Sequence, residues 1–222
     1  THQDITERKR AEEELARYAD DLKRSNEELE QFAYVVSHDL QEPARMVESY
    51  LQLLHRRYHG ALDEKADSFI DYAVDGARRM QEMIQALLNL SRVKTRGRAF
   101  TPCNTEIILE HTLKALSRTI AETGATITHD PLPTVRADRG QLAQVFQNLI
   151  ANALKFRREG AAPRVHISAE RRDDVWLFSV ADNGIGIDPK HAERIFHIFQ
   201  RLHTRESYPG TGIGLALCQK IV

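Results

Sequence analysis

Cysteine is scarce in this chain, with Cys103 and Cys218 as the only two among 222 residues. Two cysteines cannot form the disulfide framework of a small secreted domain, and no cysteine–histidine cluster has the spacing of a zinc site. No apolar run approaches the roughly 18 to 20 residues of a membrane-spanning helix, and the amino end has no signal-peptide core. We therefore expect a soluble, cytoplasmic portion of a longer protein, without structural metal; the parent chain could still be membrane-anchored elsewhere.

An excess of charge of one sign is also missing, because 31 Lys+Arg oppose 32 Asp+Glu, a formal net charge of -1. This balance gives no electrostatic case for binding nucleic acid or an acidic membrane. With 41% hydrophobic and 28% charged residues, the chain is too apolar for disorder. It is also too rich in Glu, Arg, Leu and Ala for an all-β protein, so we expect long helices.

Glycine is absent between Thr6 and Arg57, and Pro43 is the one proline there. Apolar residues occupy two positions of a seven-residue repeat: Leu15, Leu22, Leu29 and Val36 at one position, and Ile5, Ala19, Ala33 and Leu40 at the other. This pattern is typical of a left-handed coiled coil, in which Asn26 can fix the register of two parallel helices. A long amphipathic helix packed within one subunit is the alternative. We favour the dimer because the positions between are too polar to face a globular core.

The segment from Tyr58 to Asp63 predicts a break in this helix, with Asp63 as the N-cap of a second one. Helically spaced apolar residues then run to about Val93: Phe69, Ile70, Ala73, Ala77, Met80, Ile84, Leu87 and Leu88. Two such helical hairpins would bury their apolar stripes against each other as a dimeric four-helix bundle. The polar stretch 94–104, which holds a glycine and a proline, is interpreted as a linker.

Helices and strands alternate beyond this linker. We expect a helix over 105–123, strands at 125–129 and 134–137, a helix from the cap Asp138 to Phe156, paired strands at 165–171 and 175–181, and a last helix starting near Gly212. Helices beside hairpin-linked strands predict an α+β (α/β) sandwich as the second domain.

Two asparagines on one helical face mark the first candidate motif. Asn148 and Asn152 lie four residues apart, and Lys155 follows one turn later. Amide oxygens and water suit Mg²⁺, while an ammonium suits phosphate. Asn costs helix stability relative to Ala, so two on one face indicate a role. A cap or an inter-helix hydrogen bond is the alternative role.

The second motif is Asp182-Asn-Gly184-Ile-Gly186, at the end of an apolar strand. A carboxylate there can accept a hydrogen bond from the exocyclic amine of adenine, and the glycines let the backbone approach the base closely. Asp-Asn-Gly is also an ordinary turn, which is the alternative reading.

The third motif, Gly210-Thr211-Gly212-Ile-Gly214, lies immediately before and inside the first turn of the last helix. Backbone N–H groups and the helix dipole favour a polyphosphate there. The spacing differs from a P-loop and from a dinucleotide-binding fingerprint. A glycine-rich hinge is the alternative.

The order and spacing of the three motifs together closely resemble the ATP-binding catalytic domain of sensor histidine kinases. That superfamily also includes gyrase, the mismatch-repair ATPases and a heat-shock chaperone. Residues 147–156 resemble its N box, 182–187 its first glycine box and 209–216 its second, while Ile195 to Phe199 is similar to its F box. Tyr208-Pro-Gly-Thr-Gly212 looks most like the phytochrome-type and related kinases.

The resemblance implies ATP and Mg²⁺ as cofactors. Asn152 would coordinate Mg²⁺ with support from Asn148, Lys155 would reach phosphate, and Asp182 would read adenine. Residues from about 187 to 210 would form a lid, with Phe196 and Phe199 as its core anchors. The full set of nucleotide-binding residues it implies is Asn148, Asn152, Lys155, Asp182, Gly184, Gly186, Gly210, Thr211, Gly212 and Gly214.

Among the ten histidines, His38 stands out on the long helix. Its heptad neighbours are seam positions, so we expect its side chain to point outward. The string Ser37-His38-Asp39-Leu40-Gln41-Glu42-Pro43 resembles the family's H box, in which the histidine accepts phosphate. An adjacent carboxylate such as Asp39 can orient the imidazole as a general base and stabilise its cation. Pro43 removes a helix N–H and would bend the helix there.

The resemblance also predicts the domain order. Residues 1–30 are interpreted as a coiled-coil signalling linker, because Asp4 to Lys9 resembles the exit from a PAS sensory domain. Residues 31–95 would be the dimerisation and histidine phosphotransfer hairpin, and 104–222 the catalytic ATP-binding domain. We expect that domain to be truncated at its C-terminus, because the family's domain continues beyond Val222.

The leading hypothesis is a homodimeric protein-histidine kinase that phosphorylates His38 from ATP and passes the group to an aspartate of a response-regulator receiver domain. The resemblance puts regulator docking among Met46 to Leu54 and Arg78 to Gln85. Glu42 stands where many relatives carry Thr or Asn, which predicts a kinase with little phosphatase activity. A non-catalytic dimerisation scaffold and an ATPase that performs conformational work are the alternatives.

Overall fold

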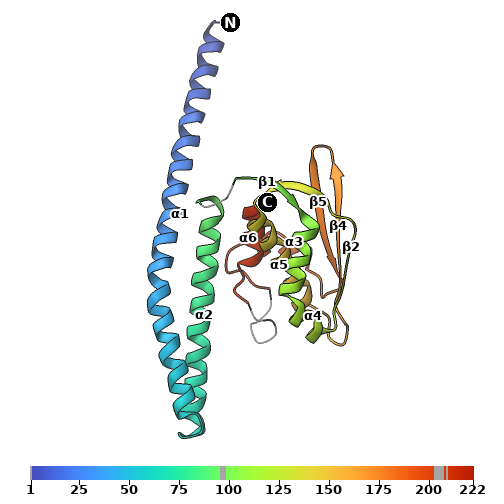
Figure 1. Ribbon diagram of the computed structural model, residues 1–222. Helices are drawn as coiled ribbons and strands as arrows, with labels where there is room; N and C mark the ends of the chain where they lie inside the picture. Colours follow the sequence, from blue (N-terminus) through green and yellow to red (C-terminus); the bar gives the residue numbers. More distant parts are fainter. Residues whose placement is uncertain (1, 96–98, 203–207, 209) are drawn as a thin grey trace. The chain divides into compact units, whose positions relative to one another are not determined.

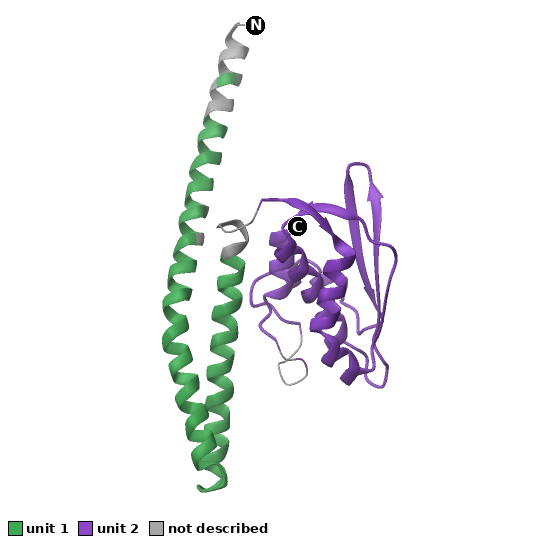
Figure 2. Ribbon diagram, viewed as in Figure 1, with its two compact units in different colours: residues 1–91 green, residues 92–222 purple. Residues whose placement is uncertain are grey.

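The structure, a computed structural model, describes residues 2–95, 99–202, 208 and 210–222. The chain divides into two compact units, Thr1–Ser91 and Arg92–Val222 (Figures 1 and 2). The finer three-part assignment into linker, phosphotransfer hairpin and catalytic domain stays a prediction.

The first unit is a helical hairpin of α1 (His2–Tyr58) and α2 (Glu64–Thr95). The break falls where it was expected: Ala61 N donates to Tyr58 O at 2.9 Å, and Gly60 adopts φ 76°. Asp63 is the N-cap of α2, since its Oδ1 accepts a hydrogen bond from Ala66 N at 2.7 Å. The hairpin is therefore set by local turn and cap chemistry.

Small and apolar side chains form the seam between the two helices. Ala44, Ile84 and Leu88 make its core, with Tyr34 partly buried against them. Polar pairs cross the same seam. Gln41 Nε2 donates to Gln85 Oε1 at 3.0 Å, so these two turns of α1 and α2 face each other. Pro43 lies inside α1, which continues as one helix through it.

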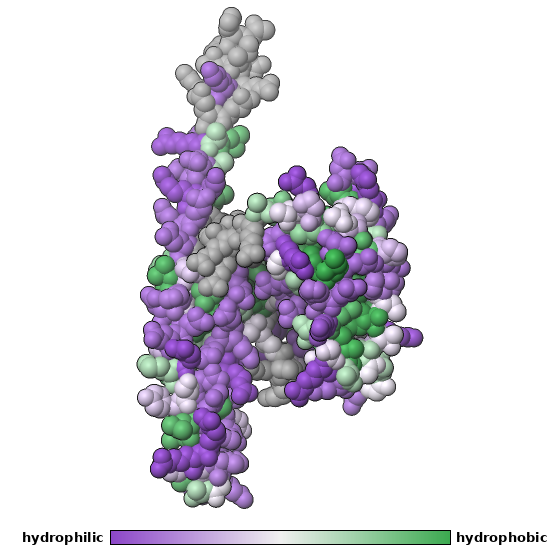
Figure 3. Space-filling view, viewed as in Figure 1, coloured by the Kyte–Doolittle hydropathy of each residue, from purple (hydrophilic) through white to green (hydrophobic). Residues whose placement is uncertain are grey.

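A second, apolar face of the hairpin is exposed in the single chain. Figure 3 shows hydrophobic side chains among the hydrophilic surface of this unit. On α1 they continue the heptad series of the sequence, and on α2 they follow helical spacing: Leu15, Leu22, Leu29, Val36, Leu40, Val47, Tyr50 and Leu54, and Phe69, Tyr72, Met80 and Met83. The side chains of Ile5 and Asn26, which belong to the predicted coiled coil, lie outside the described residues.

The second unit contains the remaining elements, in the order β1 (Thr101–Asn104), α3 (Thr105–Ala115), α4 (Ser117–Thr123), β2 (Thr126–His129), β3 (Thr134–Ala137), α5 (Arg139–Lys155), β4 (Arg164–Arg172), β5 (Val175–Asp182), the 3-10 turns η1 (Pro189–His191) and η2 (Arg194–Phe196), and α6 (Gly214–Ile221). The expected fold class, a helical hairpin followed by an α/β sandwich, is confirmed.

One layer of this sandwich is a three-stranded sheet in the order β2-β4-β5. Strand β2 runs parallel to β4, and β5 runs antiparallel to β4 with Val165 opposite Asp182. Helices α3 and α5 cover one face of the sheet (Figure 1). The core between the layers contains Ile108, Leu109, Phe146, Ile150, Leu154, Val165 and Ile167.

The linker predicted over 94–104 is wrong at both ends. Helix α2 extends to Thr95, and Thr101–Asn104 is strand β1, which pairs antiparallel with β3. Only Cys103 of this strand is buried, in the core of the unit. Because this short strand has one inward side chain and is otherwise polar, its sequence has no apolar alternation that would predict a strand. Residues 96–98 of the predicted linker lie outside the described residues.

The single helix predicted over 105–123 is two helices. Helix α3 ends at Ala115 and α4 begins at Ser117, with Leu116 between them at φ -93° and ψ 3°. No glycine or proline marks this break in the sequence. The last helix begins at Gly214, two residues later than predicted, because Gly212 has φ 74° and cannot continue a right-handed helix.

Candidate functional site

Helix α5 positions the first motif. Asp138 caps it by accepting hydrogen bonds from Gly140 N at 2.7 Å and Gln141 N at 3.1 Å. Its apolar side, including Phe146 and Ile150, is buried in the core. With a period of 3.6 residues, this places the asparagines and Lys155 on other faces of the helix.

Asn148 faces helix α6. A Cβ added to Gly214 would lie 3.1 Å from Asn148 Oδ1, so the two helices approach most closely where one side chain is missing. Cys218, one turn along α6, is buried, and burial raises its pKa to about 11 against a smaller opposing effect of the Asn148 amide. Asn148 therefore lies between α5 and α6, which is the position that the inter-helix alternative requires. Asn152, one turn further along α5, is half-buried.

Lys155 links the first motif to the third. Its Nζ lies 4.1 Å from the centroid of the Phe156 ring and 3.0 Å from the place that a Cβ on Gly210 would occupy. Burial first, and then the charge of Arg201, hold the pKa of Lys155 below its usual value. No described carboxylate forms an ion pair with Lys155. Two cations close together in a half-buried place favour an anion there.

The sequence reading missed Arg201. Its guanidinium donates to the carbonyl of Tyr208, and the Tyr208 ring lies 5.0 Å from that of Phe156. Arg201 lies 46 positions after Lys155 in the chain, and only the folded loop brings the two together. No local spacing signal could have found it.

The second motif packs on the end of α5. Asp182, exposed at the end of β5, accepts a hydrogen bond from Gly184 N through Oδ1 at 2.7 Å. Phe156 O accepts one from Ile185 N at 3.0 Å. A Cβ on Gly184 would lie 2.4 Å from Phe156 O, a distance that no side chain tolerates. Gly184 is therefore required for this contact, whereas Gly186, at φ 73°, meets nothing within 4 Å.

The third motif leads into α6 through unusual backbone. Gly210 and Gly212 have φ 145° and 74°, and Gly212 O accepts a hydrogen bond from Phe199 N at 3.2 Å. A Cβ on Gly212 would lie 2.9 Å from Gln200 O. Thr211 between them is half-buried. The three motifs thus meet around the carboxyl end of α5 and the amino end of α6.

The lid prediction is tested only in part. Phe196 is half-buried in η2. Phe199 is 50% exposed at φ 64°, so its assignment as a core anchor is wrong; its backbone turns the side chain outward while N–H binds Gly212. Residues 203–207 and 209 of the predicted lid, with Pro209 of the second glycine box, lie outside the described residues.

His38 lies exposed on α1, with its side chain 63% accessible. Its Nδ1 is 3.2 Å from Oδ1 of Asp39, an arrangement that favours a proton on Nδ1 and leaves Nε2 as the free lone pair. The preceding Ser37 is buried. Ser37 is thus buried in the seam of the hairpin, and His38 points toward solvent, as its position in the heptad repeat predicted.

Two protein-family models match the chain. The His Kinase A (phospho-acceptor) domain matches residues 28–96, and the Histidine kinase-, DNA gyrase B-, and HSP90-like ATPase matches residues 137–222. The first contains the exposed His38 and the second contains the three converging motifs. The chain belongs to the sensor histidine kinases.

Relatives of this histidine kinase chain include cyanobacterial phytochrome A of Nostoc sp. (strain PCC 7120), 58% identical over 213 residues. The phytochrome-like protein Cph1 of Synechocystis sp. (strain PCC 6803) is 50% identical over 213 residues. Each alignment covers 96% of this chain and 28% of the relative. The histidine kinase chain therefore spans little more than a quarter of these relatives.

Among solved structures, full-length ShkA in complex with AMPPNP is similar to this histidine kinase chain, with a TM-score of 0.63 at 27% identity. The match covers 86% of this chain and 40% of that one. Within the described residues, no helix is both long and apolar enough to cross a membrane.

Proposed function

We propose that this chain binds ATP with Mg²⁺ in its second unit, phosphorylates His38, and passes the phosphoryl group to an aspartate of a response regulator. The observation that carries the proposal is the convergence of Lys155, the Asp182 turn and the Gly210 backbone at one end of α5. The match of this unit to the histidine kinase-like ATPase family supports ATP as the ligand of these residues.

Each group has a role that its surroundings support. Oδ1 of Asp182 is taken by Gly184 N, which leaves Oδ2 to accept the exocyclic amine of adenine. Lys155 and the N–H groups around Gly212 bind the polyphosphate. Its negative charge offsets the electrostatic repulsion between Lys155 and Arg201. Gly214 keeps α6 close enough for its amino end to contribute.

The half-buried amide of Asn152 fits Mg²⁺, because a neutral oxygen beside water is the kind of ligand this hard ion prefers. Asn148 supports Asn152 from the previous turn of the same helix. When bound with ATP, Mg²⁺ would offset charge on the phosphates. The chain itself supplies the fixed amides and cations that orient them.

His38 is the acceptor. Its Nε2 attacks the terminal phosphorus, an N–P bond forms, and the P–O bond to ADP breaks. The imidazole then carries a positive charge, which Asp39 at Nδ1 stabilises. The N–P bond is next broken by a carboxylate of the regulator, which regenerates neutral His38. Because Glu42 stands one turn from His38 in place of Thr or Asn, the kinase reaction dominates over dephosphorylation of the regulator.

The chain acts as a homodimer. Heptad positions of α1 that begin at Leu15 continue through Val47, Tyr50 and Leu54, all exposed in one chain. A second copy presents the same face, so two hairpins bury both stripes as a parallel four-helix bundle. A monomer rarely exposes such a stripe. A PAS-like sensor before residue 1 and a regulator docked among Met46 to Leu54 and Arg78 to Gln85 complete the proposal.

The cytoplasmic location predicted for this portion remains part of the proposal. Both cysteines are free and buried, Cys103 in the second unit's core and Cys218 in α6. A protein kept reduced needs no disulfide.

The test is transfer of label from γ-labelled ATP with Mg²⁺, comparing the wild-type chain with His38→Gln and Asn152→Asp. His111→Gln is the matched control, because His111 is an exposed imidazole on α3. We expect acid-labile, base-stable label on wild type and on the control, and none on the two variants. Label that persists in His38→Gln would refute the assignment of His38 as the acceptor. ATP hydrolysis unchanged in that variant, without label on any protein, would favour a conformational ATPase.

A further inference from the structure

Two imidazoles stack at the closed end of the helical hairpin, outside the phosphotransfer and nucleotide sites. His55 lies in the last turn of α1, and His59 follows one turn later, with His59 N donating to His55 O at 2.9 Å. The ring centroids are 4.7 Å apart and the planes differ by 19°. Histidines at i and i+4 on one helix face form a chelating pair when both lone pairs point the same way.

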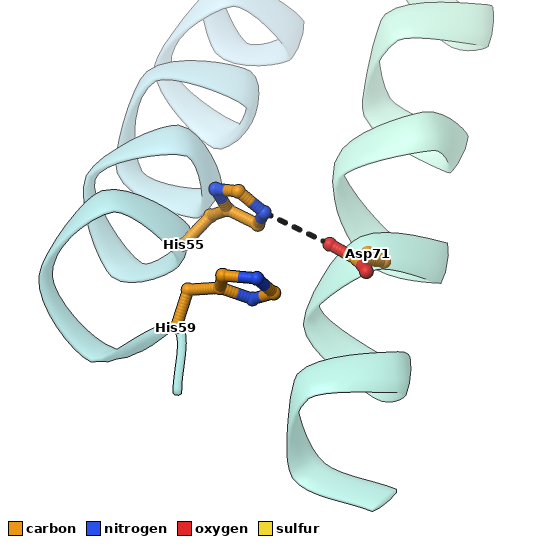
Figure 4. Close-up of side chains that lie close together, drawn as sticks. All are labelled: His55, His59 and Asp71. Atoms are coloured by element: carbon orange, nitrogen blue, oxygen red, sulfur yellow. Dashed lines mark ion pairs between the residues drawn. The ribbon is translucent and has the colours of Figure 1, made fainter. Parts of the chain in front are cut away.

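A carboxylate of the other helix faces this pair. Asp71 Oδ1 of α2 lies 3.0 Å from His55 Nε2, and one ligand atom from each of His55, His59 and Asp71 lies within 4.8 Å of the others. Figure 4 shows the ring of His55, in the last turn of α1, and the ring of His59, just after α1, both pointing toward Asp71 on α2. The His55 and Asp71 side chains are 39% and 55% accessible, so an ion can reach them.

A second carboxylate orients His59. Asp67 Oδ2 lies 3.6 Å from His59 Nδ1, and the same oxygen accepts a hydrogen bond from Gly60 N at 2.8 Å. The Asp67 side chain is only 17% accessible, so the turn holds it in place. A carboxylate at Nδ1 favours a proton there and leaves Nε2 as a metal ligand, an arrangement common around metal-bound histidines.

We propose that His55, His59 and Asp71 bind one divalent transition-metal ion of the zinc, nickel and copper class, with Asp67 as a positioning residue. Two imidazole nitrogens and one carboxylate oxygen suit these ions, whereas Mg²⁺ and Ca²⁺ prefer oxygen alone. Metal–ligand distances of about 2.0–2.1 Å place tetrahedral ligands about 3.3 Å apart. The 3.0 Å separation of His55 Nε2 and Asp71 Oδ1 is close to this spacing, and small side-chain rotations adjust it and bring in His59. Water takes the fourth position.

The bound ion would join the end of α1 to α2 across the turn. The site is separate from the proposed acceptor, because 17 residues of helix place His55 about 25 Å from His38 along α1. It belongs to one unit and uses none of the nucleotide-binding residues. The sequence contained the His55-x-x-x-His59 spacing, but the register of the hairpin was needed to supply Asp71.

The test is titration of the metal-free 222-residue chain with Zn²⁺ by calorimetry, and with Co²⁺ by its visible absorption. The variants are His55→Gln, His59→Gln, Asp71→Asn and Asp67→Asn, with His111→Gln as a matched control of an exposed imidazole elsewhere. We expect one site per chain in wild type and control. Its affinity should fall at least about tenfold in each ligand variant, and about tenfold in Asp67→Asn.

Thermal unfolding of the helical unit provides a second readout. Zn²⁺ should raise the midpoint of wild type and leave the ligand variants unchanged, while all proteins in chelator keep the same helical circular dichroism. Equal Zn²⁺ stoichiometry and affinity in wild type and every ligand variant would overturn the proposal. So would an absence of Co²⁺ ligand-field bands in wild type, which would leave the cluster as a hydrogen-bonded pair that only supports the turn.

Discussion

The Lys155 ammonium lies directly beside Gly210, because a Cβ on Gly210 would lie 3.0 Å from Lys155 Nζ. This contact joins the helix that holds the asparagines to the glycine-rich segment before α6. The position of the cation therefore depends on a residue 55 positions away in the sequence.

Replacement of Gly210 by Ala should weaken ATP binding. The new methyl group displaces Lys155, and φ 145° is strained for any side chain. Gly160→Ala is the matched control, since Gly160 has φ 73° but meets nothing within 4 Å. Calorimetric titration with ATP should show an affinity about tenfold lower for Gly210→Ala and unchanged for Gly160→Ala. Equal losses in both would mean that backbone strain alone matters.

ATP affinity should decline as the pH becomes alkaline, and the decline should begin at a lower pH than it would for a lysine with an ordinary pKa. Burial and Arg201 lower the pKa of Lys155 in the free protein, and phosphate stabilises its charged form and so raises that pKa. Binding therefore takes up a proton above the lowered pKa, and affinity declines as pH rises through it. Titrations between pH 7 and 10 in buffers of different ionisation enthalpy measure both effects. Lys155→Arg should keep a flat profile; an unchanged alkaline decline in that variant would assign it to another group.

Cys218 should be unreactive in the folded chain. Its pKa is raised from 9.0 to about 11, so at pH 8 the thiolate fraction falls from about one in ten to about one in a thousand. In a Cys103→Ser background, alkylation by iodoacetamide should be about a hundredfold slower than in guanidinium-unfolded protein. A folded rate equal to the unfolded rate would contradict the buried environment of α6.

Arginine at the exposed heptad face should dissociate the proposed dimer. Val47 is 46% exposed and Leu54 43% exposed in one chain, and a charge at either would be buried without a partner in a four-helix bundle. Light scattering after size exclusion should give a monomer mass for Val47→Arg and Leu54→Arg. Ser49→Arg, at an exposed position off this face, should stay dimeric. Retained helicity separates dissociation from unfolding, and a dimer in all three would reject this interface.

Local chemistry was readable from the sequence. The caps Asp63 and Asp138 were predicted because a cap needs only a short side chain and the N–H groups two or three residues later. Strand β1 was missed because one buried side chain, Cys103, gives no alternation to detect. The division between α3 and α4 was missed because Leu116 is no helix breaker.

Contacts between distant segments were not readable in this way. Arg201 near Lys155 depends on the loop between β5 and α6, and Asp71 beside His55 depends on the register of the hairpin. Side-chain types at fixed spacing predicted which residues would belong to the candidate nucleotide site. The glycine contacts, such as Gly184 against Phe156 O, follow only once the backbone positions are known.

Because α1 is one continuous helix, the direction in which any of its side chains points is fixed relative to the start of the helix. Its 57 residues extend about 85 Å as a single rod. The backbone at His2 and at His38 is separated by about ten full turns, so both face the same direction. Inserting one residue between them would rotate His38 by about 100° relative to anything attached upstream, whereas inserting seven would rotate it by only about 20°. Changes of this helix length by whole heptads therefore nearly preserve the direction of His38, and a twist applied at the start of the helix rotates the proposed acceptor by the same angle.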